Sequence, residues 1–177
     1  MADKKHYIIT SLTLGAIAAT SAALIGLTNL ITAKKIADNE KAQINAGIGK
    51  IYGKSASILS DSDLDEYKYS NHLYTVKTDE SENNIALRTT GSNMYGKISL
   101  LVGFSLSEEA YTLVGLYVVT NEQTYASTLI ENYVNPLNNG ERDLDDVSCG
   151  ATYGAKLIRD MVNEANEVAN KQLGKGE

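Results

Sequence analysis

One short stretch near the C-terminus has residue types and spacing that suit the binding of a phosphate group. It reads DDVSCGAT over residues 145–152 and leads into a segment predicted to be helical. Gly150 and Ala151 are small enough to let a ligand approach the backbone, and Thr152 stands where the helix would begin. Free N–H groups and the positive end of a helix stabilise an anion there, and a threonine hydroxyl can carry a phosphoester. The alternative is purely structural, with Thr152 only as the N-cap and the small residues in a tight loop.

Other kinds of catalytic or metal site are not indicated by the sequence. The two histidines, His6 and His72, lie far apart, and neither HxxxH nor CxxC spacing occurs. The single cysteine, Cys149, cannot form an internal disulfide and is either a small packing residue or a redox-active thiol. His72 has no evident serine or cysteine partner for nucleophilic catalysis, and there is no GxGxxG loop for a dinucleotide.

The charge of the chain argues against nucleic acid as a partner. The 177 residues carry a net charge of −6. The first 35 residues hold four lysines and one aspartate, so the rest of the chain has 12 basic and 21 acidic side chains, a net charge of −9. A domain with this charge repels the phosphate backbone of a nucleic acid.

The N-terminal segment is predicted to be a single transmembrane helix. No charged residue occurs over the 27 positions from Tyr7 to Ala33. As a helix this stretch spans roughly 40 Å, compared with about 30 Å for the hydrocarbon core of a bilayer. The alternative, a cleaved signal peptide, has a shorter apolar stretch. Small residues recur every fourth position from Ser11 to Ala23, which either lets partner helices approach closely or reflects the usual composition of membrane helices.

Residues 36–177 are predicted to form one domain, with residues 1–35 as the tail and anchor. An amphipathic helix over 36–53 would leave the membrane, with Ile44, Ile48 and Ile51 on one face and Gly53 as its stop. The acidic segment 60–69 is predicted to be a loop. Runs rich in β-branched residues and tyrosine predict four strands, at His72–Thr78, Ile85–Thr90, Lys97–Phe104 and Thr112–Thr120. The short links between them, including a polar hairpin at 105–110, favour an antiparallel sheet.

Two further helices are predicted to pack on this sheet. The first covers 124–134 and is followed by a loop over 135–143 that holds the only proline, Pro136. The second covers Tyr153 to Leu173, and its apolar side is formed by Ile158, Val162, Ala165 and Ala169. The predicted fold class is therefore α+β, a single N-terminal transmembrane helix followed by a small antiparallel-sheet domain with packed helices.

The 145–152 run resembles the flavinylation motif of the FMN-binding domain family. This family includes the G subunit of the Rnf ion-translocating electron transport complex and the C subunit of the sodium-pumping NADH:quinone oxidoreductase. Its pattern is Asp, two residues, Ser or Thr, then Gly-Ala-Thr, so Asp146, Gly150, Ala151 and Thr152 match, whereas Cys149 stands where Ser or Thr is usual. In the family, the final threonine bears FMN through a phosphoester bond, and a flavin transferase installs it from FAD. The resemblance implies covalent FMN on Thr152.

Two more segments resemble the family. The run MYGKI at 94–98 opens a strand much like the family's Gly-Tyr-Gly-Gly-x-Ile. The run EQTY at 122–125 resembles its Glu-Thr-Pro-Gly segment, which lies beside the flavin, with Gln123 in place of Glu and Tyr125 in place of Pro. The implied cofactor-binding residues are Thr152, Ala151, Gly150, Cys149, Ser148, Thr124, Gln123, Glu122, Tyr95 and Tyr125. The two tyrosines either stack on the flavin ring or are plain packing residues.

The resemblance implies an electron-transfer subunit with no independent catalytic activity. FMN would relay electrons in an Rnf-like ion-translocating ferredoxin:NAD oxidoreductase, with integral membrane subunits as partners and a flavin transferase during maturation. The protein would be a single-pass protein of the bacterial cell membrane, with a cytoplasmic N-terminus and the FMN domain on the outer face. Asp145 and Asp146 either serve recognition by the transferase or are solvated loop acids. Two alternatives stay open: a stand-alone surface flavoprotein for extracellular electron transfer, and a non-redox structural or assembly subunit with a degenerate motif.

Overall fold

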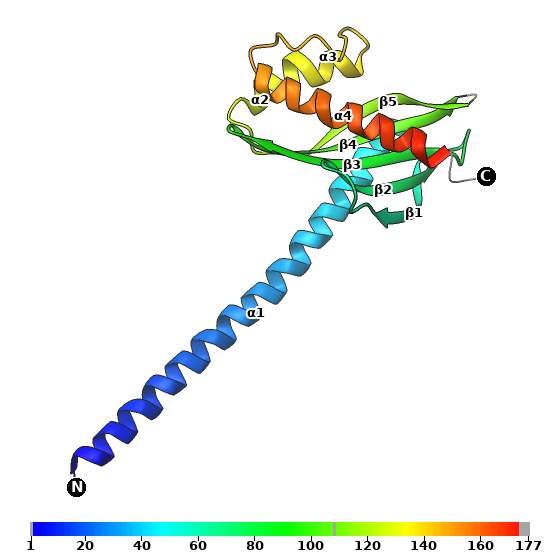
Figure 1. Cartoon of the computed structure of the whole chain (residues 1–177). Helices are drawn as coiled ribbons and strands as arrows, with labels where there is room; N and C mark the ends of the chain where they lie inside the picture. Colours follow the sequence, from blue (N-terminus) through cyan, green and yellow to red (C-terminus); the bar gives the residue numbers. More distant parts are fainter. Residues whose placement is uncertain (1, 108, 174–177) are drawn as a thin grey trace. The chain divides into compact units, whose positions relative to one another are not determined.

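The computed structural model describes residues 2–107 and 109–173 (Figure 1). The chain divides into two compact units, Met1–Ala42 and Gln43–Glu177, which are considered one at a time. The first consists of most of a long helix. The second holds the end of that helix, a five-stranded sheet and the remaining helices. The predicted α+β class, with an N-terminal apolar helix ahead of an antiparallel sheet, is confirmed.

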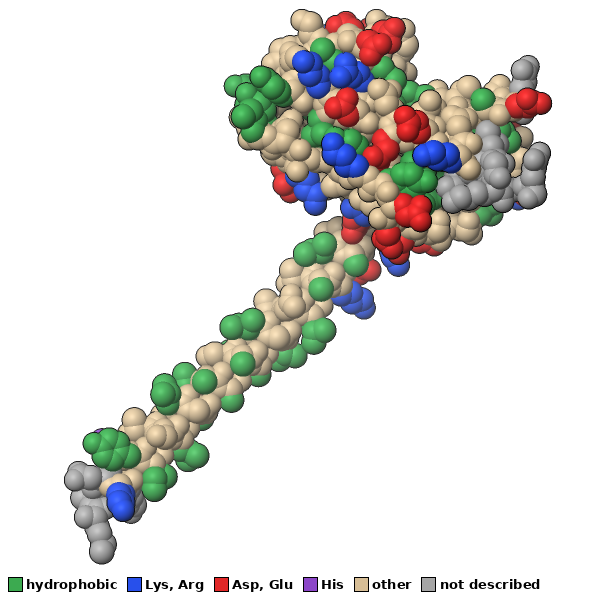
Figure 2. Space-filling model, in the orientation of Figure 1, with side chains coloured by type: hydrophobic (Ala, Val, Ile, Leu, Met, Phe, Trp, Pro, Cys, Tyr) green, Lys and Arg blue, Asp and Glu red, His purple; other side chains and the backbone are tan. Residues whose placement is uncertain are grey.

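Helix α1 runs without interruption from Ala2 to Tyr52, so the predicted anchor and the predicted helix over 36–53 are one element. Its apolar window has a mean hydropathy of 1.9 and is not buried by the residues that the structure describes, and the helix is long enough to cross a membrane. Apolar side chains cover the surface of this helix in Figure 2. Four threonine hydroxyls bond the carbonyl four residues earlier, which satisfies these polar groups within the helix, at Thr10, Thr13, Thr20 and Thr28. The helix stops at Gly53, which has φ of +96° and is the predicted stop.

The sheet is an antiparallel meander whose strands follow one another in chain order. Its strands are β1 (Ser57–Asp63), β2 (Ser70–Lys77), β3 (Asn84–Asn93), β4 (Gly96–Ser107) and β5 (Ala110–Asn121). The four predicted strands are confirmed: three are longer at both ends, and β2 begins two residues earlier and ends one residue earlier than predicted. The loop prediction for 60–69 is wrong over 60–63, because β1 is a polar edge strand held by pairing with β2 rather than by apolar burial. Within the predicted hairpin at 105–110, Glu108 lies outside the described residues.

Helical segments cover both faces of the sheet. The last turns of α1 pack on one face through Ile44 and Ile48, as the sequence pattern predicts. At this contact the Tyr52 hydroxyl lies 2.6 Å from the carbonyl oxygen of Ile85 and 3.0 Å from that of Phe104, so it ties the helix end to two strands. Burial raises the pKa of Tyr52 well above its ordinary value, so the phenol stays a neutral donor.

The other face carries α4 (Thr152–Leu173), which crosses the sheet in Figure 1. Its predicted apolar side is confirmed as buried, at Ile158, Val162, Ala165 and Ala169. Ahead of it, α2 (Ala126–Leu129), a π-helical turn η1 (Ile130–Val134) and α3 (Asn135–Asn138) follow without a break. The loop prediction for 135–143 is therefore wrong over 135–138. The π-turn changes the hydrogen-bond register just before Pro136, where an α-helix would need an N–H that proline lacks.

Candidate functional site

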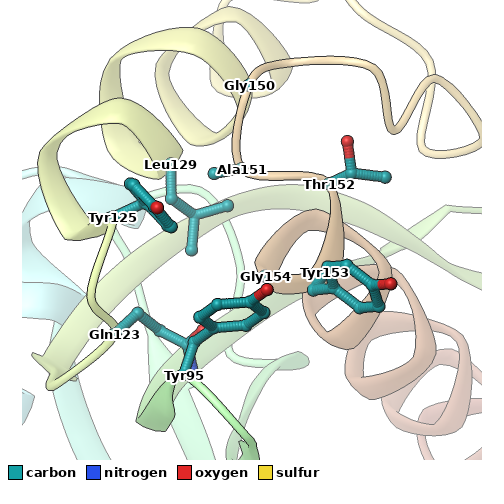
Figure 3. A pocket seen from close by; sticks show the side chains of 9 residues that line it. All are labelled: Tyr95, Gln123, Tyr125, Leu129, Gly150, Ala151, Thr152, Tyr153 and Gly154. Atoms are coloured by element: carbon teal, nitrogen blue, oxygen red, sulfur yellow. The ribbon is translucent and has the colours of Figure 1, made fainter.

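Four separate parts of the chain meet around one cavity at the N-terminal end of α4 (Figure 3). They are the β3–β4 turn, the segment between β5 and α2, one residue of α2, and residues 150–154. The cavity has a volume of about 270 Å³. Six of the ten residues assigned to cofactor binding from the sequence line it, namely Tyr95, Gln123, Tyr125, Gly150, Ala151 and Thr152.

Thr152 is the first residue of α4 and is half-buried. The first intrahelical hydrogen bond runs from the Ala155 N–H to the Ala151 carbonyl at 3.0 Å, so Ala151 occupies the N-cap position. The interpretation of Thr152 as the N-cap is therefore wrong. Within the described part of the chain, the Thr152 hydroxyl makes no hydrogen bond to another protein group. Thr152 is one of the residues that line the cavity, and in Figure 3 its hydroxyl points away from the Tyr95 ring.

The backbone entering α4 depends on two glycines. Gly150 has φ of +81°, a left-handed conformation that side chains disfavour, and it turns the chain toward the helix. Gly154 lies against α2, since a Cβ built there would come within 2.8 Å of Leu129 Cδ2. The N–H groups of residues 152–154 precede the first intrahelical hydrogen bond of α4. Together with the helix dipole, they form a positive end that favours an anion.

Gln123 provides a buried polar group in the cavity wall. Its side chain is only 6% exposed, and its Nε2 donates to the carbonyl of Gly96. Its Oε1 lies next to Gly154, within 3.5 Å of the point where a Cβ would stand. Because Nε2 can only donate, Oε1 is the side-chain atom that can accept a hydrogen bond from a ligand.

Three tyrosines from three elements surround the open side of the cavity. The Tyr95 ring lies 5.9 Å from that of Tyr125 and 5.5 Å from that of Tyr153, measured between centroids. Tyr125 and Tyr153 are 53% and 61% exposed. Aromatic faces around a partly open cavity suit a planar ring system as ligand.

The loop that leads to Thr152 is fastened by side chains from the preceding helix. The Tyr133 hydroxyl donates to the Leu144 carbonyl at 2.7 Å, and Asn132 Nδ2 donates to the Cys149 carbonyl at 3.2 Å. Burial raises the pKa of Tyr133 to about 12, so its hydroxyl stays a donor at ordinary pH.

The two acids suggested for transferase recognition, Asp145 and Asp146, each lie near an arginine. Asp146 lies 3.4 Å from Arg142 Nε and also accepts the N–H of Ser148 at 3.2 Å. Asp145 is 87% exposed and lies 4.0 Å from Arg159. Asp146 therefore shapes the loop, whereas Asp145 contributes a largely solvated charge.

Four of the residues assigned from the sequence do not line the cavity. Cys149 is 6% exposed and packs in the core below the loop, and Ser148 is exposed on the loop surface. Thr124 is exposed, and its N–H and hydroxyl both bond the Tyr95 carbonyl. Glu122 is exposed and pairs through its backbone with Lys97. A direct role for these four in cofactor binding stays a prediction.

The cavity also contains residues that sequence reasoning missed. Leu129, Tyr153 and Gly154 complete the lining. Asn93 links two sides of the site, because its Oδ1 accepts the Tyr95 N–H and its Nδ2 donates to the Tyr153 carbonyl. Tyr153 and Gly154 directly follow Thr152 in the sequence, and this proximity could have indicated that they line the site. Nothing in the spacing of Asn93 indicates its role.

The fold and the cavity define a protein with one apolar N-terminal helix and a small α+β domain that holds a ligand-sized site. Comparison with known families matches residues 1–49 to the model described as the RnfG N-terminal region. No curated protein sequence matches the chain. From Ala2 onward the matched residues all fall within α1, so this likeness to an Rnf protein lies in the helix. Together with the exposed apolar helix, the match supports a single-pass membrane protein whose N-terminal region is similar to that of RnfG.

Proposed function

We propose that this chain is a membrane-anchored flavoprotein subunit that relays electrons through FMN held covalently on Thr152. The observation that carries the proposal is the position of Thr152 at the start of α4. Its hydroxyl makes no hydrogen bond within the described residues, and Thr152 lines a cavity together with three tyrosines. The match of residues 1–49 to the RnfG N-terminal region supports an Rnf-type complex as its setting.

The residues around the cavity fit a flavin. The volume of about 270 Å³ is near the lower end for ligand sites and suits the ring part of a larger cofactor whose phosphate lies at the rim. Tyr95 and Tyr125 offer aromatic faces, and Gln123 Oε1 offers an acceptor for a ring N–H. FMN supplies the redox chemistry when bound, while these residues orient the ring and limit its contact with water.

Attachment uses the hydroxyl of Thr152 as the nucleophile. Its oxygen attacks the phosphorus in the FMN half of FAD, forming the phosphoester bond while the P–O bond of the pyrophosphate breaks and AMP leaves. The hydroxyl proton passes to a base of the flavin transferase. The N–H groups at the start of α4 stabilise the phosphate charge, and Asp145, which is largely solvated, remains accessible for recognition by the transferase.

The same proposal assigns partners and orientation. Integral membrane subunits of an Rnf-like ferredoxin:NAD oxidoreductase would contact α1, whose small residues from Ser11 to Ala23 allow close helix packing. The N-terminus would be cytoplasmic, and the FMN domain would lie on the outer face. Tethering keeps the flavin at high effective concentration near its redox partners.

Intact-mass measurement of the full chain, produced with a flavin transferase, tests the proposal. The wild type should gain one FMN, and Thr152→Ala should gain none. Thr112→Ala is the matched control, because Thr112 is an exposed threonine of β5 that does not line the cavity, and this change should leave the FMN mass unchanged. A wild-type chain without added mass, purified from its native membrane, would refute the flavin function and favour the non-redox assembly subunit.

Affinity purification of the full chain from native membranes separates the two flavin functions. Co-purification of integral membrane subunits in fixed ratio is expected for the Rnf-like subunit. A flavinylated chain that purifies alone would instead support the stand-alone surface carrier.

A further inference from the structure

Tyr153 and Tyr95 form an aromatic pair that joins the first turn of α4 to the β3–β4 turn. Their ring centroids lie 5.5 Å apart with an angle of 42° between the ring planes. Tyr153 keeps 61% of its surface exposed, although it lines the cavity directly after the attachment residue. A large aromatic side chain half in water beside a cavity is well placed to cover a ring bound there.

One side chain holds this pair in place. Asn93 accepts the Tyr95 N–H through Oδ1 at 2.8 Å and donates through Nδ2 to the Tyr153 carbonyl at 3.2 Å. Both hydrogen-bonding ends of a single amide are thus used to link two elements that are 60 residues apart in sequence. The other side of the β3–β4 turn is fixed by Thr124, which bonds the Tyr95 carbonyl through its N–H at 2.8 Å and its hydroxyl at 3.2 Å.

These contacts hold the backbones of the two tyrosines in place relative to one another. The Tyr95 backbone is bonded on both sides, and the Tyr153 backbone is bonded to the same amide. Holding an aromatic surface ready before a ligand arrives reduces the ordering that binding requires.

We propose that Tyr153 is the flavin-covering residue of this site and that Asn93 is the positioning residue that holds it against Tyr95. This inference rests on the proposed attachment of FMN to Thr152. Tyr153 limits the access of water to the flavin and quenches its fluorescence by contact of the phenol with the ring. Asn93 acts only through the positions of the two tyrosines.

The test measures fluorescence of the covalently bound FMN and its quenching by iodide, in the full flavinylated chain. Tyr153→Leu should raise the fluorescence severalfold and increase iodide quenching, while Tyr153→Trp keeps both near the wild-type values. Asn93→Asp keeps the acceptor for the Tyr95 N–H but replaces the donor to the Tyr153 carbonyl with a repelling oxygen. It should therefore shift both readouts in the direction of Tyr153→Leu.

Asn71→Asp is the matched control for Asn93→Asp. Asn71 is an exposed asparagine of β2 that donates to Thr90 and does not line the cavity. The flavin fluorescence and iodide quenching of the Asn71→Asp variant should equal those of the wild type. Wild-type values in both Tyr153→Leu and Asn93→Asp, each carrying one FMN by mass, would overturn the inference. A wild-type chain that gains no FMN would instead refute the proposed function itself.

Discussion

Replacing Tyr133 by phenylalanine tests whether the loop that carries the attachment residue is held from below. Tyr133 is fully buried, and its hydroxyl donates to the Leu144 carbonyl at 2.7 Å. The Arg142 guanidinium lies 5.7 Å from the ring centroid. Phenylalanine keeps the ring and its packing, so the change removes the hydrogen bond and little else. At neutral pH the free energy of unfolding should fall by about 1–2 kcal/mol.

The same variant should change how stability depends on alkaline pH. Burial raises the pKa of Tyr133 from 10.0 to about 12, so above pH 10 the unfolded chain loses this proton while the folded chain keeps it. The hydroxyl's contribution is present below pH 10 and is lost as the pH rises from 10 to 12. A difference of two pKa units corresponds to about 2.7 kcal/mol. Because phenylalanine does not titrate, Tyr133→Phe should become as stable as the wild type, or more stable, near pH 12.

Urea unfolding of the full chain in detergent, followed by circular dichroism at a series of pH values, measures both effects. Other titrating groups, including the buried Tyr52, are present in both proteins and cancel in the difference. The wild-type advantage should be constant up to about pH 10 and then shrink and reverse. Parallel stability curves for the two proteins between pH 10 and 12 would refute the reasoning.

Two other changes test the packing of α4 on the sheet by the same unfolding assay. Glu164 accepts the backbone N–H groups of residues 68–70, including that of the buried Ser70 at 2.7 Å, so Glu164→Ala should lower the free energy of unfolding by about 2–4 kcal/mol. The exposed Glu167 provides the control, because Glu167→Ala should lower it by less than about 0.5 kcal/mol. Equal losses in the two variants would contradict this account. The buried hydroxyl of Thr89 has no hydrogen-bond partner among the described residues, so Thr89→Val should stabilise the domain by about 1 kcal/mol. Thr90→Val loses hydrogen bonds to two side chains and should instead destabilise it.

The sequence predicts most of the fold because its strong elements are apolar and periodic. The strands β2 to β4 and helix α4 bury large apolar side chains, so local patterns indicate them. Strand β5 buries only Leu116 and Val119, but its β-branched and aromatic residues indicate it as well. Strand β1 escapes this reasoning, since its residues are polar and exposed and only its register with β2 defines it. The helical segment at 135–138 is also not predicted by local patterns. A proline such as Pro136 usually ends a helix, and the π-turn before it has no recognisable sequence pattern.

From residue patterns alone the site could be predicted only as separate pieces, and it was the family resemblance that grouped them. Thr152 at a helix start follows from the pattern of small residues before an amphipathic segment. That Tyr95, Gln123 and Tyr125 lie beside it depends on the pairing of β4 with β5 and on the path of the chain into α2, which spacing does not encode. The role of Asn93 is harder still to predict from the sequence, because it arises only when the β3–β4 turn and α4 are adjacent in the fold.

The structure gives a physical account of the one departure within the attachment motif. Cys149 stands where the family has Ser or Thr, yet its side chain packs into the core rather than lining the cavity. The Cys149 carbonyl, not its thiol, makes the contact that holds the loop, because it accepts a hydrogen bond from Asn132. A thiol is buried at low cost, whereas a hydroxyl in the same place would need a partner. The substitution therefore preserves the backbone path that Gly150 turns toward Thr152, and the proposed attachment depends on that path.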